Sequence, residues 1–166
     1  KRNFVRALLQ RHPDITTIVQ NINAGQTSLV LGPHSEVLYG PGYIHEQLGD
    51  FTFRISPRAF YQINPVQTEV LYRTALDYAG LTGKETVVDA YCGTGTIGIF
   101  ASRNAARVIG VENNRDAVRD AISNAKANRA DNVRLYTADA SDFLQGMAKT
   151  GEHAHVTLLD PPRAGS

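Results

Sequence analysis

The spacing of apolar residues changes near residue 64. Upstream of it, short runs rich in β-branched and aromatic residues alternate with Gly, Pro and Asn, a pattern typical of antiparallel strands. These runs cover residues 15–23, 27–32, 36–40, 43–48 and 50–56. Ahead of them, an amphipathic helix is predicted over residues 2–12, because apolar residues recur there at helical spacing.

Downstream of residue 64, helical and strand patterns alternate. A helix is predicted from Pro65 to Gly80, with one apolar side formed by Val66, Val70, Leu71, Ala75 and Leu76. The predicted strands then cover residues 85–91, 107–112, 132–138 and 155–160, and the helices between them cover 94–105, 115–129 and 141–149. This alternation indicates βαβ units and a parallel sheet. The runs at 108–111 and 156–159 are continuously apolar, which predicts strands covered on both faces.

The pattern therefore predicts an α/β fold in two parts. Residues 1–63 form a small antiparallel α+β attachment, and residues 64–166 form a core with four parallel strands. Of the 166 residues, 42% are hydrophobic and 20% are charged, which is typical of a folded protein. The single cysteine excludes an internal disulfide framework and fits a reducing compartment. No apolar run is long enough to span a bilayer, so we expect a cytoplasmic protein without a membrane partner.

A glycine-rich turn follows the first strand of the core. Gly93, Gly95 and Gly98 fit the pattern G-x-G-x-x-G, and Glu112 comes 19 residues after Gly93, at the end of the next strand. Such glycines let the backbone approach a ligand, and the acid accepts hydrogen bonds from ribose hydroxyls. The turn therefore favours a ribose-containing cofactor and leaves its identity open.

Asp89, four residues before Gly93, separates the candidate cofactors. In an NAD site the pyrophosphate lies over this turn, where a carboxylate would repel it. S-adenosylmethionine instead carries a positive sulfonium and an ammonium group, which a carboxylate attracts. We therefore predict S-adenosylmethionine, with an NAD-dependent oxidoreductase as the alternative. Asp89 also fits a cap for the following helix, and the two roles are compatible.

Two further carboxylates follow predicted strands. Asp139 fits either a contact with the adenine amino group or the N-cap of the helix at 141–149. Asp160 begins the motif DPPR, whose prolines fix the backbone. Because ligands bind at the carboxyl ends of strands in open α/β sheets, Asp160 is expected at the same crevice as Asp89 and Glu112.

Together these motifs resemble the RNA uracil-5 methyltransferases, which make 5-methyluridine in transfer and ribosomal RNA. The resemblance covers nearly the whole chain and rests on VVDAYCGTGTIG, VIGVENN, TADA and LLDPPRAG, on FRISPRAFYQINPVQTEVLY, and on NINAGQTSLVLG and VLYGPGYIHEQLGDFTF. It implies a Rossmann-like class I methyltransferase core, with the parallel sheet truncated after its fourth strand, and S-adenosylmethionine as cofactor. RNA is the implied partner.

By position, the resemblance implies roles for individual residues. Gln62, Tyr91 and Thr96 match cofactor contacts. Glu112 matches the ribose-binding acid, and Asp160 matches the acid between the cofactor and the target uracil. Two more residues are implied as contacts with RNA or the base, namely Phe60 and Arg163.

In the family, a cysteine thiolate adds to C6 of uracil and makes C5 nucleophilic, and a base later removes the C5 proton. Both lie downstream of DPPR. We therefore expect no catalytic residue before Ser166, and a segment that binds cofactor without turnover. Cys92, inside the glycine turn, is interpreted as packing or as part of the cofactor wall rather than as the nucleophile.

Other interpretations concern surfaces. The arginines of the first helix, with Arg54 and Arg58, leave open a non-catalytic RNA-binding module, although a solvated helix face explains them as well. The five histidines show no metal-ligand spacing, so no metal site is predicted. If the strand at 155–160 ends the sheet, its apolar edge predicts self-association of the segment.

Overall fold

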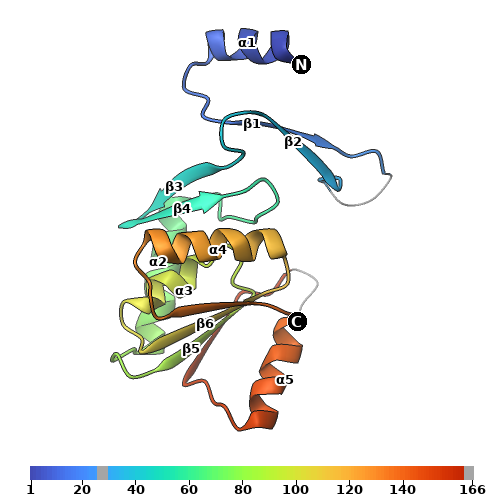
Figure 1. Ribbon diagram of the computed structural model, residues 1–166. Coiled ribbons are helices and arrows are strands. Elements are labelled where there is room, and N and C mark those ends of the chain that lie inside the picture. Colours follow the sequence, from blue (N-terminus) through green and yellow to red (C-terminus); the bar gives the residue numbers. More distant parts are fainter. Residues whose placement is uncertain (26–29, 163–166) are drawn as a thin grey trace.

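The computed structural model describes residues 1–25 and 30–162. Helix α1 (Arg2–Arg11) comes first and is followed by two antiparallel hairpins (Figure 1). The hairpins pair β1 (Ile18–Ile22) with β2 (His34–Tyr39), and β3 (Ile44–Leu48) with β4 (Phe51–Ile55). The predicted helix and four of the predicted antiparallel strands are confirmed. The predicted strand at 27–32 lies partly outside the described residues, and its described part, 30–32, is not a strand.

The core is a parallel four-stranded sheet in the order β7-β6-β5-β8. Its strands are β5 (Thr86–Ala90), β6 (Arg107–Glu112), β7 (Val133–Thr137) and β8 (Val156–Leu159). Its helices are α2 (Pro65–Ala79), α3 (Thr96–Ser102), α4 (Arg115–Ala127) and α5 (Ala140–Thr150). The predicted α/β architecture with a parallel sheet is therefore confirmed.

Alternate residues of the central strands pack on opposite faces of the sheet. Val87 and Val108 belong to a cluster that includes residues of α2, α3, α4 and the β3–β4 hairpin. Val88 and Ile109 belong to a second cluster with Met147 of α5. Figure 1 shows the same layers, with α5 on one face of the sheet and α2, α3 and α4 on the other. Both faces of β5 and β6 are covered, which explains the continuously apolar run 108–111 within β6.

Strand β8 departs from the prediction of two covered faces. Val156 and Leu158 pack against the core, but Thr157 and Leu159 are exposed. In the part of the chain that the structure describes, β8 pairs only with β5 and forms one edge of the sheet. The face of β8 that carries Thr157 and Leu159 is therefore open to solvent.

Helix α2 buries only part of its predicted apolar side, because Ala75 and Leu76 are half-buried and Leu76 packs against the core. An apolar stripe normally marks the buried side of a helix, yet Val66, Val70 and Leu71 are exposed. The buried residues are Thr68 and Tyr72. Hydrogen bonding explains the difference, because the hydroxyl of Thr68 bonds to the carbonyl of its N-cap Asn64 at 2.7 Å and Tyr72 bonds to a residue of the glycine turn. The predicted end at Gly80 is confirmed, with a φ of 57°.

Residues 1–25 and 30–162 contain neither a membrane-spanning helix nor a group of side chains suited to a metal ion. No helix there combines the length and the apolar character that crossing a bilayer requires. Nor does this part of the chain bring together three or more His, Cys, Asp or Glu side chains in a group suited to a metal ion.

Candidate functional site

The glycine turn joins β5 to α3 through backbone conformations that few residues adopt. Gly93 and Gly95 have φ angles of 54° and 80°, and Tyr91 has a φ of 65° although it is not a glycine. A bulky residue in this left-handed region is strained, and such strain concentrates at functional sites. At Gly95 an added Cβ would also lie 3.1 Å from the Cβ of Ala121 on α4. The turn itself therefore requires its glycines.

Asp89 is the buried carboxylate of the site, with 2% of its surface exposed. Its Oδ2 accepts a hydrogen bond of 2.9 Å from the N–H of Gly98 in the first turn of α3. The N-cap of α3 is Gly95, which has no side chain, so Asp89 serves as the predicted cap. Burial raises the pKa of Asp89 from 3.8 to about 7, the Gly98 bond lowers it, and the nearby Asp160 and Glu112 raise it further. A cation placed here would lower the pKa of Asp89 again, against the effects of burial and of the two neighbouring carboxylates.

Glu112, at the end of β6, connects the glycine turn to the next helix. Its Oε2 accepts the N–H of Gly93 at 3.0 Å, and its Oε1 accepts the N–H of Asn114, the N-cap of α4, at 2.8 Å. A carboxylate has roughly four acceptor sites. Each oxygen therefore keeps capacity for a hydroxyl while two backbone groups hold the carboxylate in place.

A cavity of about 40 Å³ lies between the glycine turn and residues 60–62. The predicted site residues that line it are Phe60, Gln62, Asp89, Tyr91, Gly93, Thr96 and Asp160. Gln62 and Asp160 are 98 residues apart in the chain and meet here, with 3.5 Å between Nε2 and Oδ2. Small-molecule pockets measure roughly 300–1,000 Å³. A cofactor would therefore extend well beyond this cavity.

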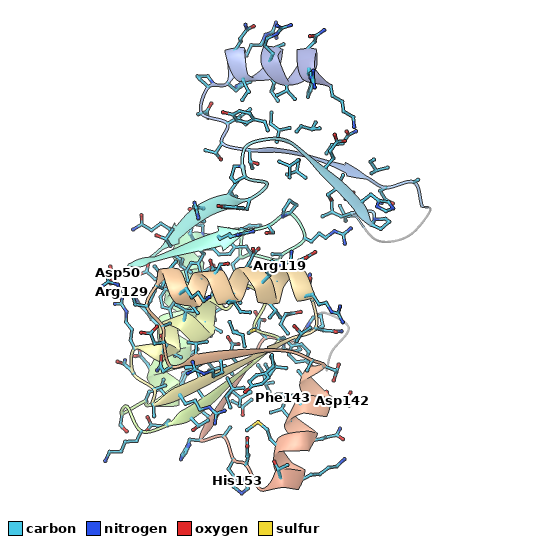
Figure 2. The ribbon with its side chains drawn as sticks, viewed as in Figure 1. Asp50, Arg119, Arg129, Asp142, Phe143 and His153 are labelled. Atoms are coloured by element: carbon cyan, nitrogen blue, oxygen red, sulfur yellow. The ribbon has the colours of Figure 1, made fainter. Side chains whose placement is uncertain are left out.

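Asp139 lies outside this lining, as the N-cap of α5. Its Oδ1 accepts the N–H groups of Ser141 at 2.9 Å and Asp142 at 3.1 Å. The capping interpretation is confirmed, and the contact with adenine stays a prediction. Figure 2 shows Asp142 and Phe143 at this end of α5. Gly95 and Glu112 also lie outside the lining, and Arg163 falls outside the described residues.

Cys92 is packed into the base of the turn. Its N–H donates to the carbonyl of Val111 at 3.0 Å, and a Cβ added at Gly110 would lie 3.1 Å from its Sγ. Burial, followed by the charges of Asp89 and Glu112, raises the pKa of the thiol well above its usual value. A thiol with a raised pKa is a poor nucleophile at neutral pH. The structure agrees with the interpretation of Cys92 as packing and as part of the cavity wall.

Sequence reasoning missed several residues of the lining, namely Tyr61, Tyr72, Thr94 and Ile97. The hydroxyls of Tyr72 and Thr96 bond at 2.7 Å, which ties α2 to the start of α3. Burial raises the pKa of Tyr72 to about 12, the Thr96 bond lowers it, and Asp89 and Asp160 raise it. Tyr72 lies four residues before Leu76, which packs against the same cluster, so helical spacing from Leu76 is the signal that could have marked it.

Comparison with known proteins places this site in a family. Residues 69–166 match the family described as conserved hypothetical protein 95. The chain belongs to this family. The match begins in α2 and includes the glycine turn, Glu112 and Asp160.

The similarity to curated relatives covers almost the whole chain, beyond the residues that the family description matches. The chain is 42% identical to an uncharacterized RNA methyltransferase of Caldanaerobacter subterraneus, over 99% of this chain and 36% of that protein. It is 43% identical to an uncharacterized RNA methyltransferase of Halalkalibacterium halodurans, with the same coverage of both. The chain spans about a third of the length of these relatives. Its resemblance to RNA methyltransferases is confirmed at this general level.

Solved structures confirm the fold. The tRNA (uracil-54, C5)-methyltransferase of Pyrococcus abyssi, in complex with S-adenosyl-L-homocysteine, is 26% identical with a TM-score of 0.71, over 95% of this chain and 37% of that chain. A methyltransferase of Agrobacterium tumefaciens, described as SAM-dependent, is 19% identical with a TM-score of 0.63, over 80% of this chain and 46% of that chain, and shows the fold alone. The predicted Rossmann-like methyltransferase core is therefore confirmed.

Proposed function

We propose that this chain is the cofactor-binding part of an S-adenosylmethionine-dependent RNA methyltransferase that acts on C5 of uridine. Asp89 carries the proposal, because it is buried at the carboxyl end of β5 and lines the cavity beside the glycine turn. Asp160 lines the same cavity, and both carboxylates favour a cationic ligand. The pyrophosphate of NAD would meet repulsion there, so the oxidoreductase alternative is not favoured.

The residues present fit this cofactor by their chemistry. Asp89 lies where it would attract the cationic methionine end, and Glu112 offers acceptor sites for ribose hydroxyls. Asp139 offers an acceptor for the adenine amino group at the start of α5. Tyr91 and Thr96 complete the wall of the cavity. The bound cofactor would supply an electrophilic methyl group, and these side chains would bind and orient it.

The RNA part of the proposal has two supports. The curated relatives are described as RNA methyltransferases, and the Pyrococcus abyssi structure is that of a tRNA uracil-C5 enzyme. Phe60, which is 69% exposed beside the cavity, offers an aromatic face on which a base can stack. Asp160 and Gln62 lie next to it in the lining as hydrogen-bonding partners for a base. Cys92 does not provide the thiolate that uracil-C5 chemistry needs, because it is buried with a raised pKa.

Calorimetry tests the cofactor. We expect saturable binding of S-adenosylhomocysteine to the chain and none of NAD. Asp89→Asn keeps an acceptor for the N–H of Gly98 but removes the charge, and should weaken binding of S-adenosylhomocysteine by about tenfold, or about 1.4 kcal/mol. Asp14→Asn, on an exposed residue far from the glycine turn in the sequence, is the matched control. Binding of NAD alone would overturn the assignment.

Mass spectrometry of nucleosides tests the substrate. Full-length protein would be incubated with S-adenosylmethionine and unmodified transfer or ribosomal RNA, and the RNA would then be digested. The expected product is 5-methyluridine. A methylated nucleoside of another kind would keep the methyltransferase and reject uridine C5.

A further inference from the structure

A row of polar side chains on α4 joins the β3–β4 hairpin to the core. Asp120 and Asn124 of α4, with Asn128 at its C-cap, lie four residues apart and so follow one face of the helix; we call them the α4 polar strip. Asp120 is 0% exposed and Asn124 is 1% exposed. Buried polar groups need hydrogen-bond partners. The side chains of the strip bond to the backbone of β4, along the edge that does not pair with β3, and to Ser56 just after β4.

The two asparagines bond to the backbone of β4 in the same way. Asn128 accepts the N–H of Thr52 at 3.0 Å and donates to the carbonyl of Thr52 at 2.8 Å. Asn124 accepts the N–H of Arg54 at 2.7 Å and donates to its carbonyl at 3.1 Å. Each amide therefore takes the place of a residue on a neighbouring strand.

Asp120 continues the row. It accepts the N–H of Ser56 at 2.7 Å and the hydroxyl of Ser56 at 2.8 Å, and it lies 3.0 Å from Nε of Arg54. Four residues of a helix rise about 6 Å and two residues of a strand rise about 6.6–6.8 Å. The two repeats match closely enough for the strip to follow β4 residue by residue.

Within the strip, only Asn124 also bonds to the glycine turn. Its Nδ2 donates to the carbonyl of Thr94 at 3.0 Å. Thr94 lies between Gly93 and Gly95 and lines the cavity. One buried amide thus holds β4 on one side and the glycine turn on the other. The chain that leaves β4 leads to residues 60–62, which line the same cavity opposite the turn.

We propose that Asn124 is a positioning residue for the cofactor crevice, because its amide sets the separation between the glycine turn and the segment that follows β4. A second tie supports this role, since Asn114 at the N-cap of α4 donates to the carbonyl of Arg58 at 3.1 Å. The proposal rests on the proposed function only in naming the ligand of the crevice.

Asn128 is the control that matches Asn124 in hydrogen bonding, although Asn124 is buried and Asn128 is half-buried. Both amides make three hydrogen bonds, and Asn128 makes its third to the carbonyl of Asn124 within α4. Replacement of either residue by alanine removes two bonds to β4. Only Asn124→Ala removes the bond to the glycine turn.

The first measurement is calorimetric binding of S-adenosylhomocysteine. We expect Asn124→Ala to raise the dissociation constant at least tenfold and Asn128→Ala to change it less than about threefold. Equal effects of the two variants would overturn the proposal. If Asn124→Ala does not fold by circular dichroism, Asn124→Ser and Asn128→Ser replace the pair, since the short uncharged hydroxyl removes the amide without burying a charge against the carbonyls of Arg54 and Thr94.

The second measurement needs no ligand. Amide hydrogen exchange should rise at least tenfold at Gly93 and Gly95 in Asn124→Ala, and stay unchanged there in Asn128→Ala. Exchange in β4 should rise in both. Equal exchange of the glycine turn in the two variants would refute the positioning role. A wild-type chain that fails to bind S-adenosylhomocysteine would defeat the proposed function, and the exchange experiment would still decide the role of Asn124.

Discussion

The two antiparallel hairpins have similar lengths and similar sequence patterns, yet only one of them belongs to the core. In β3–β4, Leu48, Phe51 and Phe53 are buried and pack with residues of the sheet and of α2 and α3. In β1–β2, every described strand residue is exposed or half-buried. Figure 1 shows α1 and β1–β2 on the far side of β3–β4 from the parallel sheet.

The difference lies in what each hairpin meets. The β3–β4 hairpin packs its aromatic residues on the core, and the α4 polar strip covers its outer edge. The β1–β2 hairpin contacts α1, in which no residue is buried. Alternating polar and apolar residues therefore predict a strand, but a strand becomes part of a core only where another element covers it.

Large core substitutions test this comparison most strongly. Phe53 is 0% exposed and Val37 of β2 is 51% exposed. We expect Phe53→Ala to lower the free energy of unfolding by about 3–5 kcal/mol, because it removes a buried ring and leaves a cavity. Val37→Ala should change it by about 0.5 kcal/mol or less. Urea denaturation measures both, and similar losses would mean that the two hairpins are equally integrated.

The α4 polar strip provides the next test. Loss of one partner of a buried ion pair costs about 3–5 kcal/mol, but Arg54 is 30% exposed and can be rehydrated, so we expect Asp120→Ala to cost about 2–3 kcal/mol. Asp116 on the same helix pairs with the exposed Arg119 at 3.3 Å. Asp116→Ala should cost at most about 0.5 kcal/mol. Equal costs in urea denaturation would show that the strip does not hold the hairpin.

Local patterns explain why the core was predictable. The strand predicted at 107–112 is β6, and the helices between the core strands begin and end near their predicted residues. Caps and the glycine turn also depend on neighbouring residues, so the capping roles of Asp89 and Asp139 could be stated in advance. These features are local in the chain, as is their physics.

Features that depend on distant partners were not predictable. Tyr72 of α2 is buried where its hydroxyl bonds to Thr96, 24 residues away. The strip residues read as an ordinary solvated helix face, since polar residues at helical spacing usually face water. Only the position of the β4 edge reveals that Asn124 is buried and bonded to the glycine turn. The cavity lining combines residues from both parts of the chain for the same reason.

The pH dependence of stability extends the comparison to Asp89, which lines the same cavity as residues 60–62 of the segment that follows β3–β4. The pKa of Asp89 is about 7 in the folded state against an ordinary 3.8. The folded state therefore binds more protons than the unfolded state between these values. The free energy of unfolding should fall as pH rises from about 4 to about 7, by at most about 1.4 kcal/mol per pH unit.

Urea denaturation of Asp89→Asn across this pH range provides the check. The variant cannot titrate at this position, so the part of the fall due to Asp89 should disappear. Asp14→Asn, which changes an exposed residue between α1 and β1, should keep the fall. A wild-type stability that stays level between about pH 4 and 7 would contradict the raised pKa.

Two glycines give the smallest and most selective test. A Cβ added at Gly40, next to β2, would lie 2.1 Å from the carbonyl oxygen of Thr16, whereas one added at Gly80, at the end of α2, would have nothing within 4 Å. Both residues have positive φ angles, 72° and 57°. We expect Gly80→Ala to lower the free energy of unfolding by about 1 kcal/mol, through its left-handed backbone alone.

Gly40→Ala introduces the worse clash but should change the free energy of unfolding by less than about 0.5 kcal/mol, because β1–β2 can open without the core. The clash should appear instead as faster amide hydrogen exchange in β1 and β2, with exchange in β5 and β6 unchanged. A greater loss of stability at Gly40 than at Gly80 would place β1–β2 in the same cooperative unit as the sheet. The two hairpins would then differ in burial but not in their share of stability.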